Sequence, residues 1–147
     1  MRAIRKHTAA LLLLYATLLI SCSKPEAPPA VAAEPEVNSR TEFTDRIENY
    51  FEYEPFRSGK ASQIRIHLTD LSDGSPVEQA QVTLAMHPRG SSGAAGAIVQ
   101  STSRIGKVRG IYVAEITPPG PGDYDIEFHI KNDRLDERLP LSNFKVE

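Results

Sequence analysis

The chain is predicted to form an all-β domain, an immunoglobulin-like sandwich of about seven strands. Three segments alternate apolar and polar residues with a period of two, which is typical of strands buried on one face only: residues 63–69, 81–87 and 124–130. Glycine, proline and aspartate cluster between these segments and predict turns. No window carries the apolar period of an amphipathic helix. These observations together favour a small antiparallel sandwich.

The first 21 residues have the organisation of a secretory signal. Arg2, Arg5 and Lys6 precede an apolar run over residues 9–20. A basic start, a short apolar middle and small residues before a cleavage point are characteristic of a signal peptide. The run is shorter than the roughly 20 apolar residues of a membrane-spanning helix. An ordinary cleaved signal and an uncleaved anchor are the alternatives to the interpretation that follows.

The segment ends in Leu19-Ile20-Ser21-Cys22, which contains the one cysteine of the chain. An apolar tetrad of this kind resembles the bacterial lipobox. The resemblance implies cleavage between Ser21 and Cys22, with lipid on the sulfur and on the new amino terminus of Cys22. Serine, not aspartate, follows the cysteine, which is similar to the default for outer-membrane sorting. We therefore expect a membrane-anchored lipoprotein facing the periplasm, in the outer membrane rather than the inner.

Residues 22–40 are predicted to be an extended tether. Pro25, Pro28, Pro29 and Pro35 stand among alanines and glutamates, with few bulky apolar residues. Such a segment cannot offset its ordering entropy by burial. At about 3.1 Å per residue, a polyproline II chain of this length spans roughly 50 Å. The folded domain is expected to occupy residues 41–147.

Four weaker strand candidates complete the predicted sandwich, at residues 47–53, 98–103, 111–116 and 141–146. Turn-forming residues separate the strands at 73–76, 89–96, 106–110 and 118–122. Tyr124 follows the last of these turns and occupies the position of a tyrosine corner, a feature of immunoglobulin-like domains. The cysteine and tryptophan core of antibody domains is absent.

The charge balance excludes some classes of function. Cleavage would remove three basic residues and no acidic one, which leaves 14 of 17 basic residues against all 19 acidic ones. A nucleic-acid-binding protein needs a basic surface to neutralise phosphates, so we expect no nucleic-acid partner. For the same reason the acyl chains, not basic side chains, would hold the protein at the membrane. No catalytic motif is present, and we predict that the protein is not an enzyme.

A series of short motifs after the tether resembles a known family. Tyr53-Glu54-Pro55-Phe56, His67-Leu68-Thr69-Asp70-Leu71 and Gly110-Ile111-Tyr112 come in the order found in the N-terminal β-domain of periplasmic adaptors of heavy-metal RND efflux systems. The resemblance implies a stand-alone accessory domain, associated with metal resistance and with an efflux component. Those adaptors continue into a helical hairpin, a lipoyl-like domain and a β-barrel, which this sequence lacks.

Histidine and methionine are the candidate ligands for copper or zinc. Strand parity places Met86 with Val82 and Leu84 on a core face, and it places His67, His87 and His129 on outer faces of different sheets. We therefore expect no bound cofactor. A weak copper or zinc site at Met86 and His87 is the alternative, which would make the protein a periplasmic metal carrier.

The favoured hypothesis is a lipid-anchored module that binds another envelope protein, without catalysis. The aromatic residues Phe51, Tyr53 and Phe56 are the predicted contact. His67 is predicted to orient the Asp70-Leu71 turn or to belong to the partner surface. A structural envelope lipoprotein with no specific ligand is the third alternative.

Overall fold

The computed structural model describes residues 36–90 and 98–147, which form nine β-strands. Residues 1–35 and 91–97 lie outside the described residues, and with them the predicted signal, the lipidation site, most of the tether and most of the 89–96 connection. No helix long and apolar enough to cross a bilayer occurs in the two described ranges. The strands are β1 (Asn38–Phe43), β2 (Ile47–Tyr53), β3 (Ser62–Asp70), β4 (Gln81–Pro88), β5 (Val99–Thr102), β6 (Arg104–Ile105), β7 (Ile111–Ile116), β8 (Gly122–Lys131) and β9 (Asp136–Val146).

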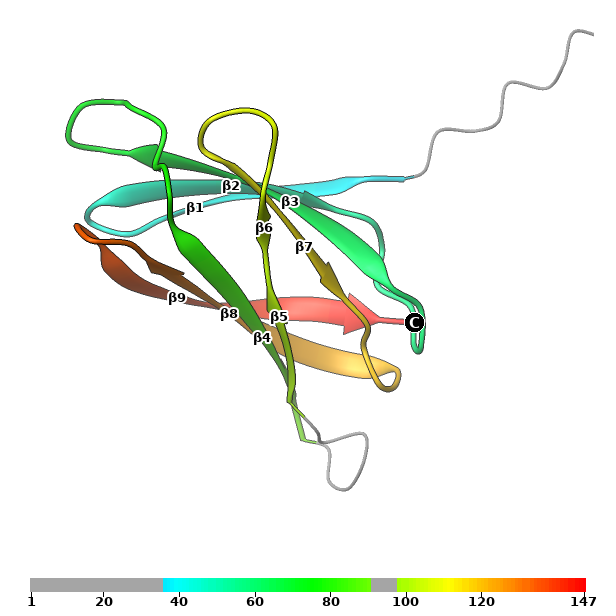
Figure 1. Cartoon of the computed structure of the whole chain (residues 1–147). Helices are drawn as coiled ribbons and strands as arrows, with labels where there is room; N and C mark the ends of the chain where they lie inside the picture. Colours follow the sequence, from blue (N-terminus) through cyan, green and yellow to red (C-terminus); the bar gives the residue numbers. More distant parts are fainter. Residues whose placement is uncertain (1–35, 91–97) are drawn as a thin grey trace, which may run out of the picture. The chain divides into compact units, whose positions relative to one another are not determined.

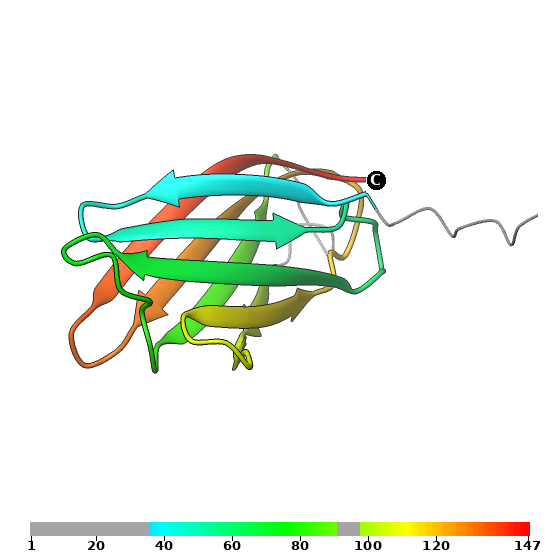
Figure 2. The same cartoon turned by 90° about the horizontal axis from the view of Figure 1, so that it is seen from above.

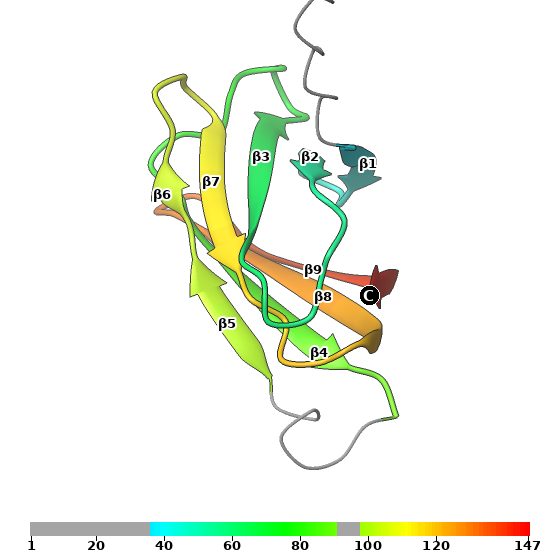
Figure 3. The same cartoon turned by 90° about the vertical axis from the view of Figure 1, so that its right-hand side faces the viewer.

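The strands form two antiparallel sheets that face each other (Figures 1 and 3). The five-stranded sheet has the order β1-β2-β3-β7-β6, and the four-stranded sheet has the order β5-β4-β8-β9. Without β1, these are the A-B-E-D and C′-C-F-G orders of an immunoglobulin-like sandwich. The predicted fold class is confirmed.

All seven predicted strands occur, and β1 and β6 are additional. β1 begins at Asn38, before the Thr41 at which we expected the domain to start. Its inward residues include Arg40 and Glu42, so the apolar alternation that reveals a buried strand face is missing. β6 contains only Arg104 and Ile105, which is too short to show a period. It pairs with β7 across the predicted hairpin at residues 106–110.

The core fills the space between the sheets. The inward parity predicted for the three clearest strands is confirmed, because Ile66, Met86 and Phe128 are each 0% exposed. Phe51 of β2 packs across the core against Phe128 of β8, with ring centroids 4.9 Å apart. Aromatic pairs at this separation add about 0.5–1.5 kcal/mol beyond the area that they bury. The core therefore joins the two sheets through aromatic as well as aliphatic contacts.

Tyr124 forms the predicted tyrosine corner. Its ring is buried, and its hydroxyl donates a hydrogen bond of 2.9 Å to the backbone oxygen of Gly120. This bond spans the turn that leads from β7 into β8. The connection between the two sheets is thus fixed at the start of β8.

Two contacts join the sheets along the side of the sandwich where β1 and β9 are the edge strands. Arg40 of β1 donates a hydrogen bond of 2.9 Å to the Ser142 oxygen of β9, and its guanidinium lies 4.8 Å from the centroid of the Phe144 ring. Phe56, in the connection after β2, forms a parallel bridge with Val146. A β-bulge shifts the pairing of β9 with β8 near Ser142. Such bulges are one way in which proteins protect a sheet edge.

Asn49 is a polar residue within this core. It is 0% exposed, and neither its amide oxygen nor its amide nitrogen has a hydrogen-bond partner among the described residues. Such an unpaired group destabilises a fold by about 1–3 kcal/mol. We expect Asn49→Leu, a change to an apolar side chain of similar volume, to raise the free energy of unfolding by about 1–2 kcal/mol. Urea denaturation followed by circular dichroism measures this, and a loss of stability would contradict it.

Candidate interaction surface

The outer face of the five-stranded sheet carries an uncharged row of side chains. Thr41, Tyr50, His67 and Ile111 are consecutive cross-strand neighbours on β1, β2, β3 and β7. We call these four residues the Tyr50–His67 row. The Tyr50 and His67 rings meet edge to face with centroids 5.3 Å apart. All four residues retain exposed area, so the row presents an amphipathic strip across the sheet.

Charged residues flank this row on one side. The Tyr50 hydroxyl donates a hydrogen bond of 2.8 Å to Glu52, and this bond raises the pKa of Tyr50. Glu52 also accepts an ion pair from Arg65 at 3.5 Å. The Nε2 atom of His67 is buried and has no hydrogen-bond partner among the described residues. The row therefore combines a fixed tyrosine with an imidazole atom whose bonding capacity is unused.

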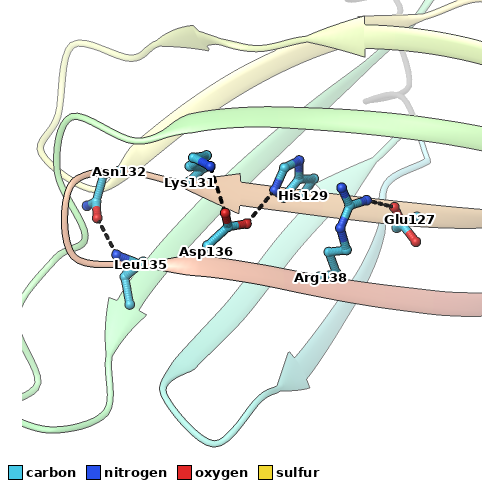
Figure 4. A network of polar contacts seen from close by, with 7 residues as sticks. All are labelled: Glu127, His129, Lys131, Asn132, Leu135, Asp136 and Arg138. Atoms are coloured by element: carbon cyan, nitrogen blue, oxygen red, sulfur yellow. Dashed lines mark hydrogen bonds and ion pairs between the residues drawn. The ribbon is translucent and has the colours of Figure 1, made fainter.

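The outer face of the four-stranded sheet is different, because its charged side chains pair with one another (Figure 4). Asp136 of β9 accepts bonds of 2.7 Å from both His129 and Lys131 of β8. Arg138 donates a bond of 2.6 Å to Glu127. These exposed pairs each contribute little to stability, because solvent screens them. This face is consistent with a solvated surface.

The Asp136 network predicts a specific pH dependence. Hydrogen bonds from Lys131 and then His129 lower the pKa of Asp136 to about 2. A carboxyl whose pKa is depressed on folding stabilises the fold above its ordinary pKa, and that stabilisation disappears as the pH falls toward 2. We expect Asp136→Asn to have a lower melting temperature than the parent chain near pH 6. Between about pH 4 and pH 2, the melting temperature of the variant should fall by less than that of the parent chain.

Thermal melts at a series of pH values test this expectation. Asp133→Asn is the matched control, since Asp133 makes no ion pair or side-chain hydrogen bond with a described residue. Parallel pH curves for Asp136→Asn and the parent would contradict the expected role of Asp136.

The histidines and Met86 do not converge. His67 lies on the five-stranded sheet, while His87 and His129 lie on the outer face of the other sheet, opposite Asp125 and Thr83. Met86 is 0% exposed in the core, on the opposite face of β4 from His87. The two residues of the alternative copper or zinc site are thus separated by the strand itself. No group of three or more potential metal ligands occurs in residues 36–90 and 98–147.

The aromatic residues that were predicted to contact a partner need correction. Phe51 and Phe56 are each 1% exposed, so they are core residues and present no contact surface. Tyr53 is half-buried and stacks on Phe56 with centroids 5.0 Å apart. The physical reason is that Phe51 shares the inward parity of Ile47, whereas its neighbour Tyr50 points outward. Tyr50 is the residue that sequence reasoning missed, although strand parity on residues 47–53 could have found it.

Among the described residues, no side-chain hydrogen bond joins His67 to the turn after β3, which it was predicted to orient. The turn is held instead by Asp70, whose carboxylate accepts bonds from the backbone and hydroxyl of Ser72 at 2.9 and 2.6 Å. The same bonds lower the pKa of Asp70. His67 lies on the outer face of β3, where its ring is partly exposed and its Nε2 atom is buried.

A cavity of about 340 Å³ lies beside the start of β1 and the end of β9. Glu36, Arg57, Lys145 and Glu147 share its wall, so side chains of both charges line it. Its electrostatics favour neither an anion nor a cation. The Tyr50–His67 row is the stronger candidate for recognition.

The fold and this surface define a class, a small immunoglobulin-like sandwich with an amphipathic sheet face. No protein-family model, curated protein or solved structure matches the chain.

Proposed function

We propose that this protein is a non-catalytic binding module of the bacterial envelope, anchored through lipid on Cys22, which recognises another envelope protein through the Tyr50–His67 row. The partner that we propose is a component of a heavy-metal RND efflux system. The signal sequence and the motifs around Tyr53-Glu54-Pro55-Phe56 and His67-Leu68-Thr69 support the location and the partner class.

The observation that carries the proposal is the contrast between the two outer faces. On the four-stranded sheet, Asp136 and Glu127 already have cationic partners. On the five-stranded sheet, Tyr50, His67 and Ile111 leave ring and aliphatic surface open to contact. Tyrosine is enriched among the residues that dominate binding energy at interfaces.

Affinity capture from crosslinked, solubilised envelope tests this proposal. The tagged full-length chain is expected to recover an RND pump, adaptor or channel component. His67→Ala and Tyr50→Ala are each expected to lower that recovery about tenfold, which corresponds to about 1.4 kcal/mol. His129→Ala is the matched control, because it removes the same side chain from the other outer face.

Two results would contradict the proposal. Recovery of only abundant lipoproteins in repeated captures would exclude the RND partner. Equal loss of the partner in His67→Ala and His129→Ala would exclude the Tyr50–His67 row as the contact.

A further inference from the structure

One edge of β1 pairs with no strand in residues 36–90 and 98–147, and this free edge has a defined hydrogen-bonding pattern. β1, in cyan, lies along the outer edge of the five-stranded sheet (Figure 2). The Thr44 nitrogen donates to the Ile47 oxygen at 2.9 Å, which makes these residues a hydrogen-bonded pair. Because such pairs alternate along an antiparallel ladder, the even-numbered residues of β1 bond to β2. The backbone groups of Ser39, Thr41 and Phe43 consequently point away from the sheet.

The side chains of this edge have an unusual arrangement. Val37 and Phe43, near its two ends, are 55% and 59% exposed, although both are large and apolar. On the inner side, Arg40 and Glu42 stand two residues apart and form an ion pair. Inward-pointing charges normally discourage a foreign strand from pairing with an edge. When two copies of the strand pair antiparallel, however, charges of opposite sign at this spacing attract, because Arg40 of each copy can lie opposite Glu42 of the other.

We propose that a second copy of this chain pairs its β1 antiparallel with this β1, with the two Thr41 residues facing each other on a two-fold axis. Such a contact is self-complementary, as two-fold interfaces must be. Thr41 bonds to its own copy, and Ser39 bonds to Phe43 of the second copy, so every free-edge residue of the strand is used. Arg40 then lies opposite Glu42 of the second copy.

The side chains select this register over its neighbours. Moving the axis by one residue places either the two Arg40 side chains or the two Glu42 side chains directly opposite each other, and like charges in that position are destabilising. The chosen register also sets Phe43 diagonal to Val37 of the second copy, a separation that aromatic side chains can reach. Two exposed apolar residues are therefore covered by one symmetric contact.

This pairing goes beyond the proposed function, because it needs no other protein. It also extends the binding surface, since Thr41 ends the Tyr50–His67 row. Pairing of the two Thr41 residues would join the rows of both copies across one continuous sheet. A contact through a single strand is small, so covalent trapping in the intact envelope is the suitable measurement.

Disulfide trapping of the full-length chain provides the test. Hydrogen-bonded antiparallel residues have Cα atoms about 5.5 Å apart, which lies within the range of a disulfide. Under mild oxidation, Thr41→Cys is expected to give at least about ten times more covalent dimer than Thr102→Cys. Thr102 is an exposed threonine on β5, the edge strand of the other sheet, and is the matched control. The parent chain measures any background from Cys22.

The register is tested separately. In the proposed pairing two Ser39 residues are about 14 Å apart, so Ser39→Cys alone should give no more dimer than the control, whereas Ser39→Cys combined with Phe43→Cys should give dimer efficiently. Dimer from Thr41→Cys no greater than from Thr102→Cys, or a strong dimer from Ser39→Cys alone, would overturn the proposal. Crosslinking of Thr41→Cys to a different protein without any dimer would overturn it also.

The outcome is independent of the proposed partner. His67→Ala and Tyr50→Ala should leave the Thr41→Cys crosslink unchanged while they lower capture of the RND component about tenfold. A crosslink without capture would therefore count against the proposed function only, and capture without a crosslink against the pairing only.

Discussion

Replacing Phe51 by alanine is expected to lower the free energy of unfolding by about 3–5 kcal/mol, the range for removing a buried phenylalanine ring. Phe51 is 1% exposed and its ring packs against Phe128 at 4.9 Å and Phe144 at 6.3 Å. These two residues belong to the four-stranded sheet, so the ring joins the two sheets. Its loss would leave a cavity that the two facing sheets cannot close by local adjustment.

The adjacent residue is the control for this prediction. Tyr50→Ala removes a ring of similar size from the outer face, and we expect it to cost about 1 kcal/mol or less, because it loses only an edge contact and an exposed hydrogen bond. Urea unfolding followed by far-ultraviolet circular dichroism measures both variants, since the chain contains no tryptophan. Similar losses for the two variants would contradict the inward and outward assignment of β2. Loss of partner capture by Tyr50→Ala without loss of stability would agree with it.

Strand parity explains how much of the fold could be predicted. Where one face is apolar and the other polar, as around Ile66, Met86 and Phe128, the alternation indicates both the strand and the buried face. It also placed Met86 in the core and His67, His87 and His129 on outer faces. The proline-rich corner before β8 likewise indicated the role of Tyr124, because a turn and a buried hydroxyl are local features.

Strand parity does not reveal a buried face when the inward side chains are charged or when both faces carry aromatic residues. β1 was not predicted because its inward side chains, Arg40 and Glu42, are charged and pair with each other and with β9. The partner contact was misplaced for the related reason that aromatic residues occur on both faces of β2. Tyr50 and Phe51 are equally suitable for an interface by composition, and their parity relative to the buried Ile47 decides which of them is accessible.

Tyr112 controls a connection that sequence patterns do not describe. The segment between β3 and β4 has no repeating apolar period, yet Val77 and Ala80 within it are buried. The Tyr112 hydroxyl donates a bond of 2.8 Å to the Val77 oxygen and accepts one of 3.0 Å from the Ala80 nitrogen. Gln79 lies in the sequence between Val77 and Ala80, and its φ of 54° is unfavourable for a residue other than glycine. Burial raises the pKa of Tyr112, so the phenol remains a neutral donor and acceptor.

Tyr112→Phe is therefore expected to lower the free energy of unfolding by about 2–4 kcal/mol, because it leaves a buried backbone oxygen and a buried backbone nitrogen without partners. Tyr53→Phe is the matched control and should cost little, since no described residue forms a hydrogen bond with the Tyr53 hydroxyl. A second variant isolates the strained backbone. Gln79→Gly should recover about 1 kcal/mol in the Tyr112→Phe background, since glycine adopts a positive φ without strain. Equal losses for the two tyrosine variants would show that the Tyr112 hydroxyl does not hold this connection in place.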